Sequence, residues 1–163
     1  MENSKKLVVY YSYTGHTKMI AESIQKELGC GILEIKPVQP YSTDYQTVVD
    51  EEQNNDSSNK APEIQKIDKD LGNYDEIIIG SPVWWYTIAP VIRTFLKEND
   101  LSGKVIKPFA TNAGWLGQTF QEIKRLCLDS KVEKGMNIVF TEDYHENQLV
   151  TSPDEVDNWI KKL

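Results

Sequence analysis

The sequence predicts an α/β fold with a doubly wound, five-stranded parallel sheet in the strand order 2-1-3-4-5 and helices on both faces. Short apolar runs alternate with helical patterns along the 163 residues, as expected where helical crossovers join parallel strands. Because such crossovers are right-handed, few topologies remain, and 2-1-3-4-5 is the natural order for five strands. The length suits a single domain spanning 1–163, with an N-terminal tail at 1–5.

The first part of the chain predicts two strands and a helix. The runs KLVVYY at 6–11 and ILEIK at 32–36 are typical of buried strands. Between them, Ile20, Ile24 and Leu28 lie four residues apart and give a helix at 17–28 an apolar face. The glycines that follow are suitable residues to end this helix.

Residues 38–73 carry many acidic side chains and show little hydrophobic periodicity. We therefore expect a long acidic excursion exposed to solvent, with one helical turn near 44–52. Connections of this length are uncommon in compact domains and are often functional.

Three further strands are expected in the second half of the chain, at 75–80, 104–110 and 136–141. Pro108 conflicts with an interior strand position, because proline cannot donate to the hydrogen-bond ladder.

Helices are expected after each of these strands, at 90–99, 119–128 and 152–163. Pro90 suits the first position of its helix. Thr119 and Glu122 have the spacing of a capping box, and Ser152 is expected to cap the last helix.

The charge and apolar content exclude several classes of function. The net charge of −7 argues against nucleic-acid binding, and it suits transient docking on basic partner proteins. No stretch approaches the roughly 18–20 apolar residues that cross a bilayer. The N-terminus does not resemble a signal peptide, so we expect a cytoplasmic protein without membrane contact.

The two cysteines, Cys30 and Cys127, lie far apart and form no CxxC pair. They indicate neither a metal site nor a redox dithiol, and we expect both to pack as small buried hydrophobic residues.

In a sheet of this order, ligands bind beyond the carboxyl ends of strands 1 and 3. The loop after the first strand reads YSYTGHT: Ser12, Thr14 and Thr17 offer hydroxyls, and Gly15 allows a tight turn before a helix. The free N–H groups at such a helix start bind phosphate, although the same loop could simply cap the helix. The spacing matches neither a GxxxxGK[ST] nor a GxGxxG motif.

Three of the four tryptophans, Trp84, Trp85 and Trp115, fall in the loops 81–89 and 111–118 that follow the third and fourth strands. Aromatic faces beside a phosphate site suggest a planar aromatic ligand that carries a phosphate. The alternative is that the rings cover the sheet edge or form a dimer contact. At least one should do so, since three rings cannot all flank one ligand ring.

Three segments together resemble the flavodoxin family. VVYYSYTGHT is similar to the family's phosphate loop, and YDEIIIGSPVWWYTIAPVIRTFL and GKVIKPFATNAG are similar to its other two signatures. They occur in order over nearly the whole chain, and the most similar branch comprises short flavodoxin-like proteins with a PVWW loop. The resemblance implies bound FMN and electron transfer with redox partner proteins, and we expect a monomer or a homodimer.

The resemblance also implies which residues bind FMN. The phosphate is expected on the first loop, at Ser12, Tyr13, Thr14, Gly15, His16 and Thr17. The isoalloxazine is expected between the other two loops, with backbone amides reaching its pyrimidine edge. These loops contribute Pro82, Val83, Trp84, Trp85, Tyr86, Thr111, Asn112, Ala113, Gly114, Trp115 and Gly117.

The chain departs from the family pattern at two points. His16 replaces the usual asparagine; it could bind phosphate and titrate near neutral pH, but the simpler expectation is an exposed histidine at a helix start. The second point is that no glycine follows Gly80 in the 81–89 loop, where electron carriers use one for a peptide flip. A flip at Trp85 or Tyr86 would force an L-residue toward positive φ at a cost, so we do not expect strong semiquinone stabilisation.

The leading functional hypothesis is an FMN redox protein in which the flavin does the chemistry and no side chain acts as nucleophile or base. The alternative is an NAD(P)H-dependent FMN or quinone reductase on the same fold. The missing glycine favours the reductase, and the acidic charge favours the carrier. A response-regulator receiver or a low-mass phosphatase lacks its required residues here, and a ligand-free interaction module is a further alternative.

Overall fold

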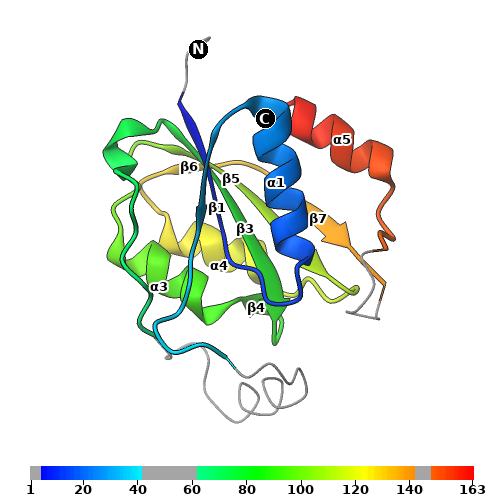
Figure 1. The fold of residues 1–163 in the computed structure, drawn as a ribbon, viewed down its shortest axis with the longest axis horizontal. Helices are drawn as coiled ribbons and strands as arrows, with labels where there is room; N and C mark the ends of the chain where they lie inside the picture. The colour runs from blue at the N-terminus through cyan, green and yellow to red at the C-terminus, as the bar shows by residue number, and fades with distance from the viewer. Residues whose placement is uncertain (1–4, 42–61, 142–147) are drawn as a thin grey trace.

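A parallel β-sheet in the order β2-β1-β3-β5-β6 forms the centre of the computed structural model, which describes residues 5–41, 62–141 and 148–163 (Figure 1). The strands are β1 (Lys6–Tyr10), β2 (Gly31–Glu34), β3 (Glu76–Trp84), β4 (Thr87–Ile88), β5 (Val105–Asn112), β6 (Lys131–Val132) and β7 (Met136–Val139). The helices are α1 (His16–Leu28), α3 (Pro90–Glu98), α4 (Thr119–Leu126) and α5 (Pro153–Lys161), with a 3-10 turn η1 at Leu71–Asn73.

This sheet confirms the predicted order. The strand numbers differ because β4 is a short antiparallel strand that folds back on β3. The fifth strand predicted at 136–141 corresponds to β7, and the short strand β6 before it was not predicted; both pair in parallel with β5, so the edge position is divided between them. The five parallel positions therefore follow the order 2-1-3-4-5.

The division of the edge strand explains how Pro108 fits inside β5. Successive residues of a strand direct their backbone polar groups toward opposite neighbours. The amide of Val105 donates to Asp75 on the β3 side, whereas the carbonyl of Ile106 accepts from Glu133 on the other side. Residue 108 faces the same side as residue 106, in the interval between β6 and β7, where a missing N–H removes no ladder bond.

The sheet is covered on both faces. Alternate β1 residues enter different apolar clusters: Leu7 and Val9 pack with α3 and α4, and Val8 packs with α1 and α5. Figure 1 shows α1 and α5 next to each other on one side of the sheet. This burial on both sides is the reason that the strands read as continuous apolar runs rather than alternating ones.

Several predicted boundaries hold and others shift. Gly29 ends α1 in the left-handed conformation (φ 64°), as expected. The strand predicted at 75–80 continues to Trp84, so residues 81–84 lie in β3 and not in a loop. The last helix begins after Ser152 as predicted, although the Ser152 side chain makes no cap hydrogen bond.

The predicted capping box of α4 is wrong. Gln118 is the N-cap residue, and the Thr119 hydroxyl donates to the carbonyl of Leu116 (2.7 Å). Glu122 turns away from the helix start because two arginine side chains bind its carboxylate.

The acidic excursion at 38–73 returns at residues 63–65 to the backbone from which it starts. The amide of Val38 donates to Glu63 (2.8 Å), and the amide of Gln65 donates to Lys36 (2.7 Å). The helical turn expected near 44–52 lies outside the described residues. None of the helices in the described ranges combines the length and apolar character needed to cross a membrane.

Candidate functional site

Three segments meet at the carboxyl ends of β1, β3 and β5: the first loop (11–15), the β3–β4 hairpin (81–88) and the third loop (113–118) (Figure 1). Pro82 pairs with Thr111 across β3 and β5. The Thr111 hydroxyl is 2.7 Å from that of Thr17 at the start of α1. The amide of Gln118 donates to the carbonyl of Tyr86, 2.7 Å away. The segments that the sequence assigned to one site are therefore in contact in pairs.

The first loop leaves the amino end of α1 open. Gly15 precedes the helix at φ 101°, and its amide donates to the Ser12 hydroxyl (3.1 Å). The N-cap residue Gly15 makes no side-chain cap hydrogen bond to this 13-residue helix, and apart from its chain neighbours no described atom lies within 4 Å of a Cβ built on it. The first N–H groups of a helix have no partner inside it, so the loop can hold an anion against them.

The buried Thr17 hydroxyl contacts Thr111 rather than facing an open loop. Sequence analysis assigned both threonines to the flavin site but did not reveal that they bind each other. The pair fixes the start of α1 against the end of β5, and only a three-dimensional contact between residues 94 apart could show this.

The expectation that His16 is exposed is wrong. Only 7% of His16 is exposed, and its ring stacks on Phe140 with centroids 4.0 Å apart and planes within 4°. The side chain lies at the start of α1, whose inner face packs on the apolar cluster that contains Phe140. His16 therefore packs α1 against the residue after β7.

The β3–β4 hairpin contains an unusual turn. Trp84 pairs with Thr87, which leaves Trp85 and Tyr86 as a two-residue turn with φ values of 49° and 67°. Positive φ at both central positions defines a type I′ turn, which favours Asn and Gly. Positive φ was expected at Trp85 and Tyr86 only as the cost of a peptide flip, but both residues already have positive φ in this structure. A strained backbone conformation of this kind costs of order 1–3 kcal/mol per residue, and it persists only where contacts with the rest of the structure hold it in place.

The third loop provides contacts that hold the Trp85–Tyr86 turn in place. A Cβ built on Gly117 would lie 2.3 Å from the Tyr86 carbonyl oxygen, so only glycine fits there. The neighbouring amide of Gln118 donates to that same oxygen. At the other end of the hairpin, the Ser81 hydroxyl accepts from the amide of Ala89 (3.0 Å).

The aromatic side chains divide into two groups. Trp84 is half-buried and contacts Tyr11, Tyr13 and Tyr41, so this ring covers the sheet edge. The other rings are exposed: Trp85 by 37%, Tyr86 by 57% and Trp115 by 56%. Pro82 and Val83 are half-buried strand residues rather than loop residues.

Asn112 orders the start of the third loop. Its side-chain oxygen accepts from the amide of Gly114 (2.8 Å), and its side-chain nitrogen donates to Asn137 in β7 (2.6 Å). Gly114 has φ 124° and is exposed, and Ala113 beside it is half-buried. The side chain of Asn112 therefore joins the third loop to β7, a role that the sequence did not indicate.

Sequence analysis also missed a buried ion pair between the two helices that follow these loops. Arg93 of α3 is 1% exposed and donates to Glu122 of α4 at 2.9 Å, and Arg125 binds the same carboxylate. Burial opposes ionisation of Glu122, but the two arginines outweigh it and lower the pKa of the carboxyl. The sequence does contain one sign of this ion pair, which is the arginine within the apolar stretch PVIRTFL.

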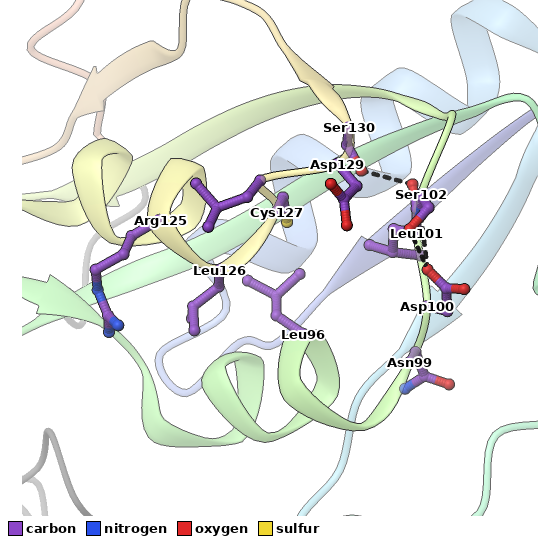
Figure 2. Close-up of a pocket in the computed structure, with 11 residues that line it drawn as sticks. Leu96, Asn99, Asp100, Leu101, Ser102, Arg125, Leu126, Cys127, Asp129 and Ser130 are labelled. Atoms are coloured by element: carbon purple, nitrogen blue, oxygen red, sulfur yellow. Dashed lines mark hydrogen bonds between the residues drawn. The ribbon is translucent and has the colours of Figure 1, made fainter.

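A cavity of about 260 Å³ lies at the opposite end of the sheet, between the ends of α3 and α4 (Figure 2). It contains none of the residues assigned to the site. Burial raises the pKa of Cys127 beside it to about 11, so this thiol stays protonated near neutral pH. Cys127 is buried as expected, whereas Cys30 is only half-buried. In the described ranges, no cluster of His, Cys, Asp or Glu could hold a metal ion.

Comparison with known proteins gives a consistent result. The family model described as Flavodoxin matches residues 5–163. A candidate flavoprotein from Bacteroides eggerthii is similar in structure (TM-score 0.78, 30% identity, 98% of each chain covered). So is a flavoprotein in complex with FMN from Lactobacillus acidophilus (TM-score 0.73, 30% identity, covering 96% of this chain and 99% of that one). A search of curated proteins found no match.

Proposed function

This chain belongs to the flavodoxin family, and from that premise we propose that it is an FMN-dependent redox protein that transfers electrons through a non-covalently bound flavin. The observation that carries the proposal is the contact of the three segments at one end of the sheet. An open helix start lies there beside two loops that bear exposed aromatic rings. The FMN complex of the similar Lactobacillus acidophilus flavoprotein supports the choice of cofactor.

The first loop suits the phosphate of FMN. Gly15 leaves room at the amino end of α1, and the helix supplies N–H groups and a positive dipole end. A dianion can bind there without a positively charged side chain. The Ser12 hydroxyl fixes the loop through the amide of Gly15, so it contributes to the shape of the phosphate site.

The hairpin and the third loop suit the isoalloxazine. Trp85, Tyr86 and Trp115 expose large apolar rings on the two loops that the Tyr86–Gln118 hydrogen bond holds together. When bound, the flavin supplies the redox chemistry, and the protein orients it and shields it from water. Because Trp84 packs on three tyrosines, we assign it to the support of this site rather than to its wall.

The hairpin turn favours one orientation of its central peptide. Rotation of the peptide between Trp85 and Tyr86 by 180° would convert the type I′ turn to type II′. That turn strongly favours glycine at its first central position, where this chain has Trp85. We therefore expect the peptide to keep its orientation on reduction, and we expect little accumulation of one-electron-reduced flavin.

This fixed turn supports a second candidate, an NAD(P)H-dependent FMN or quinone reductase on the same fold. A two-electron reductase does not need the peptide to flip. The net charge of −7 instead supports the carrier, which would dock on basic redox partner proteins in the cytoplasm around the exposed rings.

The test is reconstitution of the purified apoprotein with FMN, with riboflavin as a matched ligand that lacks the phosphate. We expect FMN to remain bound through gel filtration with its visible absorption bands, and riboflavin to bind at least about tenfold more weakly. Absence of flavin bands after reconstitution with FMN would reject both candidates. If FMN is bound, rapid anaerobic bleaching of its bands by NADH or NADPH would favour the reductase, and slow bleaching would favour the carrier.

A further inference from the structure

Trp84 lies at the centre of an aromatic cluster formed with Tyr11, Tyr13 and Tyr41. The centroid of the Trp84 ring lies 5.7 Å from that of Tyr11, 5.8 Å from that of Tyr13 and 4.9 Å from that of Tyr41. The interplanar angles of 81°, 82° and 72° make every contact edge-to-face. This geometry is the favoured one for aromatic pairs and adds to the energy of burial.

The cluster joins different parts of the candidate site. Tyr11 follows β1, Tyr13 belongs to the first loop, and Trp84 is the last residue of β3, directly before the Trp85–Tyr86 turn. Tyr41 comes from a segment with no assigned role. It is the nearest of the three rings to Trp84, and it also contacts Tyr11 at 6.1 Å.

The backbone near Tyr41 is held in place. The amide of Val38 donates to the carbonyl of Glu63, and Pro37 pairs with Ile64 in a β-bridge. On the return path, the carbonyl of Pro62 accepts from the Thr94 hydroxyl of α3 (2.8 Å). The Tyr41 ring therefore contacts Trp84 from a fixed backbone and can restrict the indole.

We propose that Tyr41 is a positioning residue for FMN: it holds the Trp84 ring of the hairpin against the first loop, and so sets the distance between the phosphate site and the isoalloxazine wall. The inference rests on the proposed FMN function. Tyr41 acts through Trp84. Loss of its ring removes the closest of the edge-to-face contacts and lets the hairpin shift relative to the first loop.

The experiment compares Tyr41→Ala and Tyr41→Phe with a matched control, Tyr74→Ala. Tyr74 is also half-buried and packs on the same apolar cluster, but it lies before β3, at the opposite end of the sheet. FMN is titrated into each apoprotein, and the dissociation constant is measured from the quenching of flavin fluorescence. Near-ultraviolet circular dichroism of the apoproteins reports the tryptophan environment without FMN.

We expect Tyr41→Ala to raise the FMN dissociation constant about fivefold to tenfold, which lies within the range that one well-formed aromatic contact supports. Tyr41→Phe keeps the ring and should stay within about twofold of the wild type, as should Tyr74→Ala. In a Trp84→Ala background, Tyr41→Ala should have no further effect. The tryptophan dichroism of apoprotein Tyr41→Ala should differ from that of the wild type.

The outcomes separate the two proposals. If wild-type apoprotein does not bind FMN, the proposed function fails and this inference fails with it. If the wild type binds FMN and Tyr41→Ala binds it equally well, only the role of Tyr41 is overturned. An equal loss of affinity in Tyr41→Ala and Tyr74→Ala would also overturn it, because the effect would then reflect general destabilisation.

Discussion

The backbone carbonyl of Tyr86 lies so close to Gly117 that a Cβ at Gly117 would be 2.3 Å from its oxygen. Tyr86 itself has φ 67° and Gly117 has φ 58°, so two left-handed residues from different loops touch. This contact fixes the β3–β4 hairpin against the third loop.

Replacement of Gly117 by alanine should weaken FMN binding as well as stability. Gly29→Ala is the matched control: Gly29 has a similar φ of 64°, but among the described residues no atom lies within 4 Å of its Cβ position. Both variants should lose about 1 kcal/mol from the left-handed backbone. Only Gly117→Ala should move the hairpin and raise the FMN dissociation constant, by about tenfold or more. Equal affinities in the two variants would contradict the role of the contact.

Replacement of the turn residues Trp85 and Tyr86 should increase the stability of the apoprotein. Asn-Gly is the preferred pair for a type I′ turn, so the double variant Trp85→Asn/Tyr86→Gly should raise the unfolding free energy of the apoprotein by about 1–2 kcal/mol. It should also bind FMN more weakly, because two exposed rings are lost from the wall. Urea unfolding and FMN titration measure the two effects. A variant that is no more stable than the wild type would show that the native turn carries no backbone cost.

The Thr17–Thr111 hydrogen bond should show coupling between the two residues. Each single change to valine leaves one buried hydroxyl without this partner and should cost about 1–3 kcal/mol of stability. The double change Thr17→Val/Thr111→Val removes both hydroxyls and should cost less than the sum of the single changes. Denaturant titration of the four apoproteins completes the cycle, and additive losses would argue against the bond.

Glu122 should contribute a pH-dependent part of the stability. Its folded-state pKa is lowered from 4.5, because binding by Arg93 and Arg125 outweighs the opposing effect of burial. A lowered pKa stabilises the folded state above the unfolded value and loses that contribution as pH falls through the folded value. Glu122→Gln should therefore be less stable than the wild type at pH 7, by about 1.5–3 kcal/mol. The difference should shrink below a pH of about 4.5.

Chemical unfolding of Glu122→Gln across pH 3–7 tests this expectation, with the exposed Glu98→Gln on α3 as the control. A gap between Glu122→Gln and the wild type that stays constant across this range would show that the ion pair does not carry the pH dependence. The Glu98→Gln variant should follow the wild type throughout.

Much of the fold could be predicted from the sequence because its signals are local. Apolar runs, the stripe Ile20, Ile24 and Leu28, and the glycine after α1 depend on neighbours within a few residues, and the predicted strand order follows from the alternation of elements. The position of the ligand end followed from that topology. The flavodoxin resemblance then identified the three segments that the structure brings together.

The sequence-based expectations failed where a contact from elsewhere in the fold decides a local conformation. Trp85 and Tyr86 adopt positive φ because Gly117 and Gln118 support them from another loop. Glu122 binds arginines instead of capping its helix, and His16 is buried by Phe140. Apart from Arg125, which lies one helical turn after Glu122, these partners are far in sequence from the residues that they affect.

The sequence by itself determined the α/β class, the strand order, the three segments that meet at the carboxyl end of the sheet and the family. The tertiary structure alone decided which aromatic ring packs on the three tyrosines and which rings are exposed, how the turn is held, and which hydroxyls bind each other. The physical reason is that periodicity and turn chemistry act over a few residues, whereas packing and hydrogen bonding between loops depend on contacts that exist only once the sheet has brought its carboxyl ends together.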